Sequence, residues 1–271
     1  MLARLREMKK IPIMAELKFF GVTYALSWAL WTLVALVPPG TPLRTALFLP
    51  GTFAPALVAL WLAPNRQELI DRLFKWQVPG RWYVFALGYL AAAKLAAAIA
   101  LRMVTGAWPA LEPGPWLLFA GGILVSTPFQ AGEEIGWRGY ALPRLTQRFG
   151  LGAASAILGV IWAAWHLPLF FIRATDTTGG SFPFYLITVT AISVAMGWLY
   201  ARTNGSLLLV MLMHSAANNT PHFVPPPAPG NVFALNATMV QWITALFLWV
   251  GAGYLLVRMR RATVGFGKTV G

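Results

Sequence analysis

The chain has 271 residues, of which 58% are hydrophobic and only 11% are charged, and its mean hydropathy is +0.64. A soluble domain carries about a quarter charged residues, so this composition excludes a soluble enzyme and indicates a polytopic membrane protein. The net charge of +13 does not indicate nucleic-acid binding, because the bases collect at the ends of apolar runs, as they do in membrane loops. The absence of cysteine excludes disulfides, thiolate zinc sites and a thiol nucleophile.

Eight apolar runs approach the roughly 20 residues that a helix needs to cross a bilayer. In chain order they cover residues 17–37, 45–63, 82–104, 115–140, 152–172, 182–201, 205–223 and 236–257. The second run is the weakest, because Pro50 and Pro55 interrupt it. Since no internal repeat and no soluble domain boundary is visible, we expect residues 1–271 to form a single all-α integral membrane domain with eight transmembrane helices.

The distribution of basic residues predicts the orientation of these helices. Of the 21 Lys and Arg residues, 17 fall on the side that both termini and the even-numbered loops share. Arg44 and Arg173 fall on the other side, and Lys94 and Arg102 fall within the third span. The positive-inside rule therefore places both termini in the cytoplasm. Lys94 lies near mid-membrane, and the sequence gives no role for it.

Two neighbouring carboxylates, Glu133 and Glu134, lie in the fourth predicted span. An ionised carboxylate in a bilayer costs on the order of 3 kcal/mol or more, so such a residue is seldom retained without a function. Glu134 and Arg138 are four residues apart, in the favoured order for an ion pair on a helix. Glu133 points in another direction and is left outside this pair.

Two histidines lie in other predicted spans: His166 in the fifth and His214 in the seventh. Asn218 follows His214 by four residues, so both side chains share one face of a helix. At about 1.5 Å per residue, Glu133 and His214 lie roughly 16 Å from the cytoplasmic edge, and His166 roughly 21 Å. The sequence therefore predicts one buried polar site that opens toward the cytoplasm.

Three motifs in residues 130–220 carry a family resemblance. They are Glu133-Glu134-x-x-x-Arg138, Trp162-x-x-x-His166 and His214-x-x-x-Asn218. In this order they resemble the CPBP family (CAAX proteases and bacteriocin-processing proteins, also called Abi). Its members are eight-span intramembrane endopeptidases and include the type II CAAX prenyl proteases. The family usually has Phe where this chain has Trp162.

The resemblance implies a role for each motif. Glu133 and His166 would activate a water molecule, and His214 and Asn218 would hold the oxyanion of the tetrahedral intermediate. Glu134 would be locked by Arg138. The substrate would be a membrane-anchored protein or peptide presented from the cytoplasmic side of a prokaryotic cell membrane. In the best-known relatives it is a prenylated CAAX protein, although a substrate without a prenyl group fits the sequence equally well.

Three alternatives stay open at this point. Glu133, His166 and His214 also make a two-histidine, one-carboxylate set that suits Zn²⁺, although the sequence has no His-Glu-x-x-His helix. A proton-coupled transporter would use the same cluster as a proton relay, but it would be expected to have paired inverted repeats. A non-catalytic bacteriocin-immunity or binding protein would share the fold alone.

Overall fold

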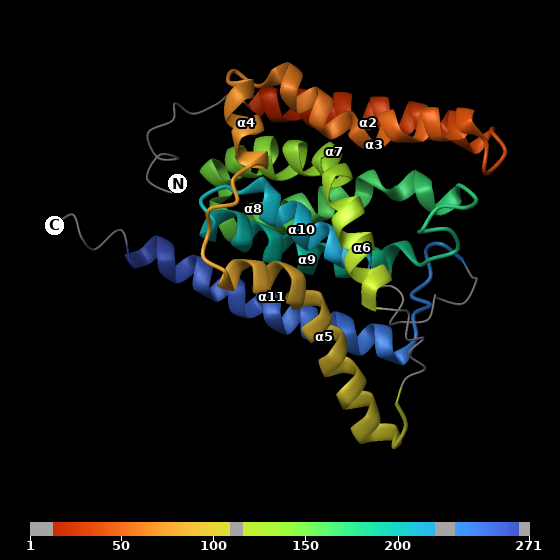
Figure 1. The fold of residues 1–271 in the computed structure, drawn as a ribbon, viewed down its shortest axis with the longest axis vertical. Helices are drawn as coiled ribbons and strands as arrows, with labels where there is room; N and C mark the ends of the chain where they lie inside the picture. The colour runs from red at the N-terminus through yellow and green to blue at the C-terminus, as the bar shows by residue number, and fades with distance from the viewer. Residues whose placement is uncertain (1–12, 109–115, 220–230, 266–271) are drawn as a thin grey trace.

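A computed structural model describes residues 13–108, 116–219 and 231–265, and every regular element in these ranges is a helix (Figure 1). The α-helices are α2 (Ile13–Ala35), α3 (Pro42–Leu62), α4 (Arg66–Leu73), α5 (Arg81–Thr105), α6 (Trp116–Ser126), α7 (Ala131–Glu134), α8 (Leu142–Trp165), α9 (Phe182–Arg202), α10 (Leu207–Asn218) and α11 (Met239–Gly265). The other elements are the 3-10 helices η1 (Thr127–Gln130) and η3 (Leu167–Phe171) and the π-helix η2 (Ile135–Ala141). The expected all-α class is confirmed for these residues.

Six helical stretches in the described residues are long and apolar enough to cross a membrane, so the protein is an integral membrane protein. They are Met14–Ala35, Pro42–Leu62, Arg81–Thr105, Ala120–Phe171, Phe182–Arg202 and Met239–Arg260. The fourth has 52 residues and contains most of the fourth and fifth predicted spans. At about 1.5 Å per residue it is far too long for one crossing of a core of about 30 Å. It is broken at Gly150, whose φ of 73° lies outside the helical region.

The seventh predicted span, residues 205–223, differs from the expectation. Its helix, α10, has only 12 residues, or about 18 Å, which is less than a crossing requires. Residues 220–223 lie outside the described ranges, as do the bases that precede residue 13. Eight crossings with both termini in the cytoplasm therefore stays a prediction.

The two prolines of the second predicted span do not end its helix. Pro50 and Pro55 both lie inside α3. Pro55 has no N–H to donate to the carbonyl four residues earlier, which belongs to Gly51. The Ser27 hydroxyl of α2 donates to that Gly51 carbonyl instead, at 2.7 Å. A neighbouring helix thus satisfies the freed backbone group, as is usual for prolines in membrane helices.

The helices pack around a central group. Figure 1 shows α2 and α3 on one flank and α5 and α11 on the opposite flank, with α7, α8, α9 and α10 between them. The pairs α8 and α9, α2 and α3, and α11 with both α9 and α5 are in extensive contact. The short helix α10 touches α5, α9, α7 and η1, which places it at the centre of the bundle.

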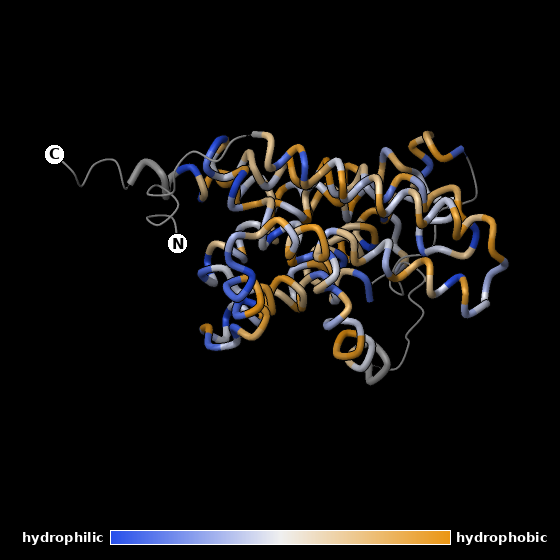
Figure 2. Tube along the Cα trace, turned by 90° about the horizontal axis from the view of Figure 1, so that it is seen from above, coloured by the Kyte–Doolittle hydropathy of each residue, from blue (hydrophilic) through white to orange (hydrophobic). Residues whose placement is uncertain are grey.

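Hydrophobic residues dominate along the helices, and hydrophilic residues gather toward helix ends (Figure 2). Against this pattern, four ionisable side chains are almost fully buried in the centre of the bundle. They are Glu133, Glu134, Arg138 and His214, with exposed fractions of 6%, 0%, 0% and 3%. Because buried charges need partners, their contacts define the candidate site.

Candidate active site

The backbone that carries the two carboxylates is irregular. Glu133 and Glu134 end the four-residue helix α7, and the chain then continues as the π-helix η2. This segment packs directly on α3, where a Cβ at Gly136 would lie 2.6 Å from the carbonyl oxygen of Pro55. Only glycine fits this approach. π-helical turns inside helices are frequent at functional sites.

The predicted ion pair between Glu134 and Arg138 is confirmed. Nη1 of Arg138 lies 2.8 Å from Oε1 and 3.1 Å from Oε2 of Glu134, and both side chains are fully buried. Nη2 donates to the hydroxyl of Ser193 on α9 at 3.3 Å. The guanidinium also lies over the ring of Trp162, 4.3 Å from its centroid. Pairing and stacking together compensate the burial of the cation.

Glu134 has a second partner that the sequence did not indicate. Its Oε1 lies 2.7 Å from Nδ1 of His214 on α10. A carboxylate that is ion-paired with Arg138 can only accept, so we assign the proton of this bond to Nδ1. In neutral His214 the lone pair is then on Nε2.

His166 is held in the same tautomer by a different partner. It follows the last residue of α8, and its Nδ1 lies 2.9 Å from the carbonyl oxygen of Trp162. A carbonyl can only accept, so Nδ1 carries the proton and Nε2 has the lone pair. The half-buried ring is packed between aromatic neighbours, with centroids 4.7 Å from Trp165 and 5.5 Å from Tyr185. The contact with Tyr185, on α9, was not predicted.

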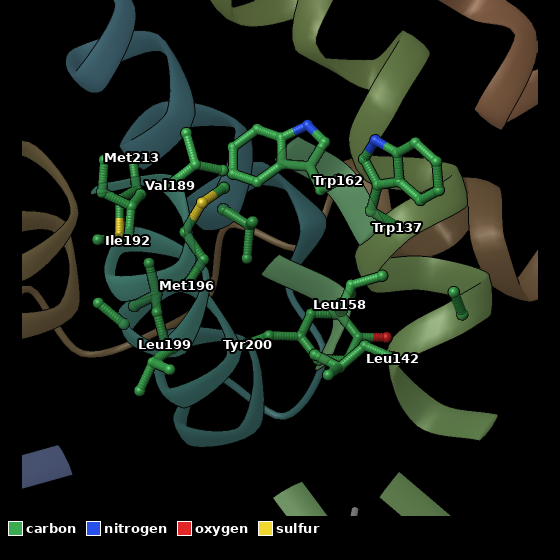
Figure 3. Packing of buried hydrophobic residues seen from close by; sticks show 14 of the residues in the cluster. Trp137, Leu142, Leu158, Trp162, Val189, Ile192, Met196, Leu199, Tyr200 and Met213 are labelled. Carbon is green, nitrogen blue, oxygen red and sulfur yellow. The ribbon is translucent and has the colours of Figure 1, made fainter. Parts of the chain in front are cut away.

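Glu133 is bonded by an indole. Nε1 of Trp162 donates to Oε2 of Glu133 at 2.6 Å, whereas Oε1 has no protein hydrogen-bond partner among the described residues. The Trp162 ring also meets both imidazoles edge-on, with centroids 5.1 Å from His214 and 5.9 Å from His166. Figure 3 shows the indoles of Trp162 and Trp137 among the side chains of the buried apolar cluster. The structure thus brings Glu133, His166 and His214 together around one tryptophan.

Asn218 is placed differently from His214. It is the last residue of α10 and is exposed, and its side chain forms no hydrogen bond within the part of the chain that the structure describes. The next residue, Asn219, donates to the Ser126 hydroxyl and to the Ser215 carbonyl, both at 2.9 Å. Ser126 and Ser215 also share a hydrogen bond, which ties α6 to α10. Polar residues in an apolar helix are the signal that could have found this contact.

The zinc alternative can be compared with these contacts. Within the described ranges, no group of three or more His, Cys, Asp or Glu side chains is arranged to hold a metal ion. In the predicted set, Glu133 is bonded to protein through Oε2 and each histidine through Nδ1, so Oε1 of Glu133 and Nε2 of both histidines are the atoms that a metal ion would use. The zinc set therefore stays a prediction.

Comparison with known proteins agrees with the motifs. Residues 112–220 match the model of a family described as Type II CAAX prenyl endopeptidase Rce1-like. The predicted family resemblance is confirmed. CAAX prenyl protease 2 of Methanococcus maripaludis is a similar protein, 24% identical over 229 residues, which cover 76% of this chain and 82% of that protein. The segment that matches the CAAX endopeptidase family contains every predicted site residue, from Glu133 to Asn218.

Proposed function

We propose that the protein is an intramembrane endopeptidase that hydrolyses a peptide bond of a membrane-anchored protein or peptide. The observation that carries this proposal is the convergence of Glu133, His166 and His214 from three helical segments around Trp162. Buried acid and imidazole groups within a bilayer mark a functional site. The match to an endopeptidase family supports hydrolysis as the function of that site.

In this proposal Glu133 and His166 activate the attacking water. The Oε1 atom of Glu133 and the Nε2 lone pair of His166 both accept hydrogen bonds, so the two groups orient one water molecule and take its proton. The water oxygen bonds to the substrate carbonyl carbon, and the carbonyl oxygen becomes the oxyanion. The carbon–nitrogen bond then breaks, and the abstracted proton passes to the leaving amine. No step requires a metal ion.

The oxyanion is held by donors from α10. The Nε2 atom of His214 donates only when both ring nitrogens carry protons, since its Nδ1 proton is already given to Glu134. Asn218 offers an amide donor that needs no proton transfer, and its exposed side chain is accessible to a substrate.

Prenylated CAAX proteins are the proposed substrates, by similarity to the protease from Methanococcus maripaludis. The sequence has no recognisable motif for binding a prenyl group, so peptides without a prenyl group are tested together with the prenylated ones. The site is proposed to face the cytoplasm of a prokaryotic cell, because the predicted loops on that side carry most of the bases.

The test is cleavage of quenched peptides by the purified protein in detergent. The peptides end in farnesyl- or geranylgeranyl-cysteine tripeptides, with unprenylated versions as controls, and each is assayed with and without a zinc chelator. We expect cleavage that persists in chelator and that is lost in His166→Ala, whose folding is checked by thermal unfolding. Loss of cleavage on chelation, restored by added Zn²⁺, would assign a metal instead. No cleavage of any peptide would contradict the proposal and favour a non-catalytic binding protein.

A further inference from the structure

Trp162 contacts four of the five ionisable residues of the site, namely Glu133, Arg138, His166 and His214. Its indole N–H donates to Glu133, and its ring lies against the guanidinium of Arg138. Its backbone carbonyl accepts the Nδ1 proton of His166. The side chain is only 4% exposed, and its ring lies nearly perpendicular to that of His214, at an interplanar angle of 78°. These contacts are more specific than the packing expected of an aromatic residue in an apolar core.

Two neighbouring tryptophans provide the comparison. Trp137 and Trp165 are fully buried, and their Nε1 atoms have no hydrogen-bond partner among the described residues. Their rings pack against each other, with centroids 5.5 Å apart at an angle of 73°. This core therefore holds indoles for their apolar surface alone, although a buried N–H without a partner is costly. The bond from Trp162 to Glu133 is a separate feature and not a consequence of burying an indole.

We infer that Trp162 is a positioning residue for Glu133, an inference that rests on the proposed endopeptidase function. The indole N–H occupies Oε2 of Glu133, which leaves Oε1 as the oxygen presented to the water. An indole can donate but cannot take up a proton, so it orients the carboxylate and does not compete with it as a base. A carboxylate fixed in one rotamer has less orientational freedom to lose when it takes the proton of the attacking water.

The indole also separates the roles of the two carboxylates. Arg138 is paired with Glu134 and stacks on the Trp162 ring, and no ion pair joins it to Glu133 in the described structure. A direct ion pair with Arg138 would occupy the carboxylate of Glu133, as it occupies that of Glu134. Trp162 supplies a neutral donor instead, so that Glu133 can accept the proton of the water.

The test compares Trp162→Phe with Trp137→Phe. Both changes shrink a buried indole to a phenyl ring, but only the first removes a hydrogen bond. We expect Trp162→Phe to lower kcat about 10- to 100-fold with KM within about twofold, since a lost donor acts on the reacting groups and not on substrate binding. Trp137→Phe should keep kcat within about threefold. Equal losses in the two variants, or a change in KM alone, would overturn the inference.

A second readout does not depend on activity. The indole N–H resonance that disappears in Trp162→Phe should shift when Glu133 is replaced by Gln, because its acceptor changes from a carboxylate to an amide. The resonance that disappears in Trp137→Phe should not shift. An unmoved Trp162 resonance overturns the inference even in an active enzyme. A wild type that cleaves no peptide overturns the proposed function, and the resonance then decides alone whether the Trp162–Glu133 bond exists.

Discussion

The Nδ1 atom of His214 lies 2.7 Å from the Oε1 atom of Glu134, a carboxylate that is already paired with Arg138. One fully buried acid therefore holds a guanidinium from its own helical segment and an imidazole from α10. The bond fixes the tautomer of His214 and joins the two segments at the centre of the bundle. Glu134 thus links the stability of the fold to the geometry of the site.

Glu134→Gln should strongly destabilise the protein, because it leaves the buried Arg138 without a counter-charge. Breaking a buried pair costs about 3–5 kcal/mol in free energy of unfolding. Glu68→Gln is the matched control, since Glu68 and Arg72 form an i, i+4 pair in the same order, and the Glu68 side chain is 55% exposed. We expect a loss of about 1 kcal/mol or less there. Denaturant unfolding of both variants measures the difference, and equal losses would contradict the role of the buried pair.

His214→Ala should act on the chemical step. If His214 donates to the oxyanion, its removal should lower kcat about 10²- to 10³-fold with little change in KM. Met213→Leu, a change of similar volume at a neighbouring buried position of α10, serves as the control. Steady-state kinetics on a cleaved peptide separates the two parameters. A His214→Ala variant that changes KM alone would assign His214 to substrate binding.

Gly136→Ala should disrupt the junction between η2 and α3. The added methyl group would lie 2.6 Å from both the Cβ and the carbonyl oxygen of Pro55, so the backbone of the π-helix must move. Because this segment directly follows Glu133 and Glu134, we expect both a lower unfolding temperature and a loss of activity. Gly88→Ala in α5 meets open space and should stabilise its helix by up to about 1 kcal/mol. A Gly136→Ala protein as stable and active as Gly88→Ala would contradict the close approach.

The predicted topology can be tested with single cysteines, since the natural chain has none and gives no background. Phe149, which precedes the break at Gly150, is 51% exposed, and Asp176 lies in an exposed turn after η3. We expect Phe149→Cys to react with an impermeant maleimide only from the cytoplasmic side and Asp176→Cys only from the outside. Labelling of both from one side would contradict two crossings within Ala120–Phe171.

The sequence predicted those features that depend on composition or on neighbouring positions in one segment. Low charge and long apolar runs predicted an all-helical membrane protein, and the i, i+4 spacing of Glu134 and Arg138 predicted their ion pair. From the sequence, the two prolines made the second predicted span the weakest. The sequence could not show that the Ser27 hydroxyl of another helix accommodates one of them by bonding the freed Gly51 carbonyl. Local patterns cannot reveal a partner that tertiary packing supplies.

The hydrogen bonds that organise the site could not be predicted from the sequence for the same reason. Trp162 and Glu133 are 29 residues apart, and His214 and Glu134 are 80 apart, so no helical spacing relates them. The conversion of residues 135–141 to a π-helix also changes the direction of the side chains after Glu134. At the end of α10, Asn218 is exposed, whereas Asn219 donates to the Ser126 hydroxyl of α6. The sequence does not indicate which of these two neighbouring asparagines contacts another helix.

Glu133→Gln tests the central claim most directly. The substitution keeps the size of the side chain and an acceptor for Trp162 but removes the carboxylate that takes the proton of the water. Single-turnover cleavage of a peptide that the wild type hydrolyses would be compared with the same reaction of folded Glu133→Gln protein. We predict a loss of at least about 10³-fold in the cleavage rate, with the peptide still bound. Cleavage at the wild-type rate would contradict the assignment of Glu133 as the base and with it the proposed mechanism.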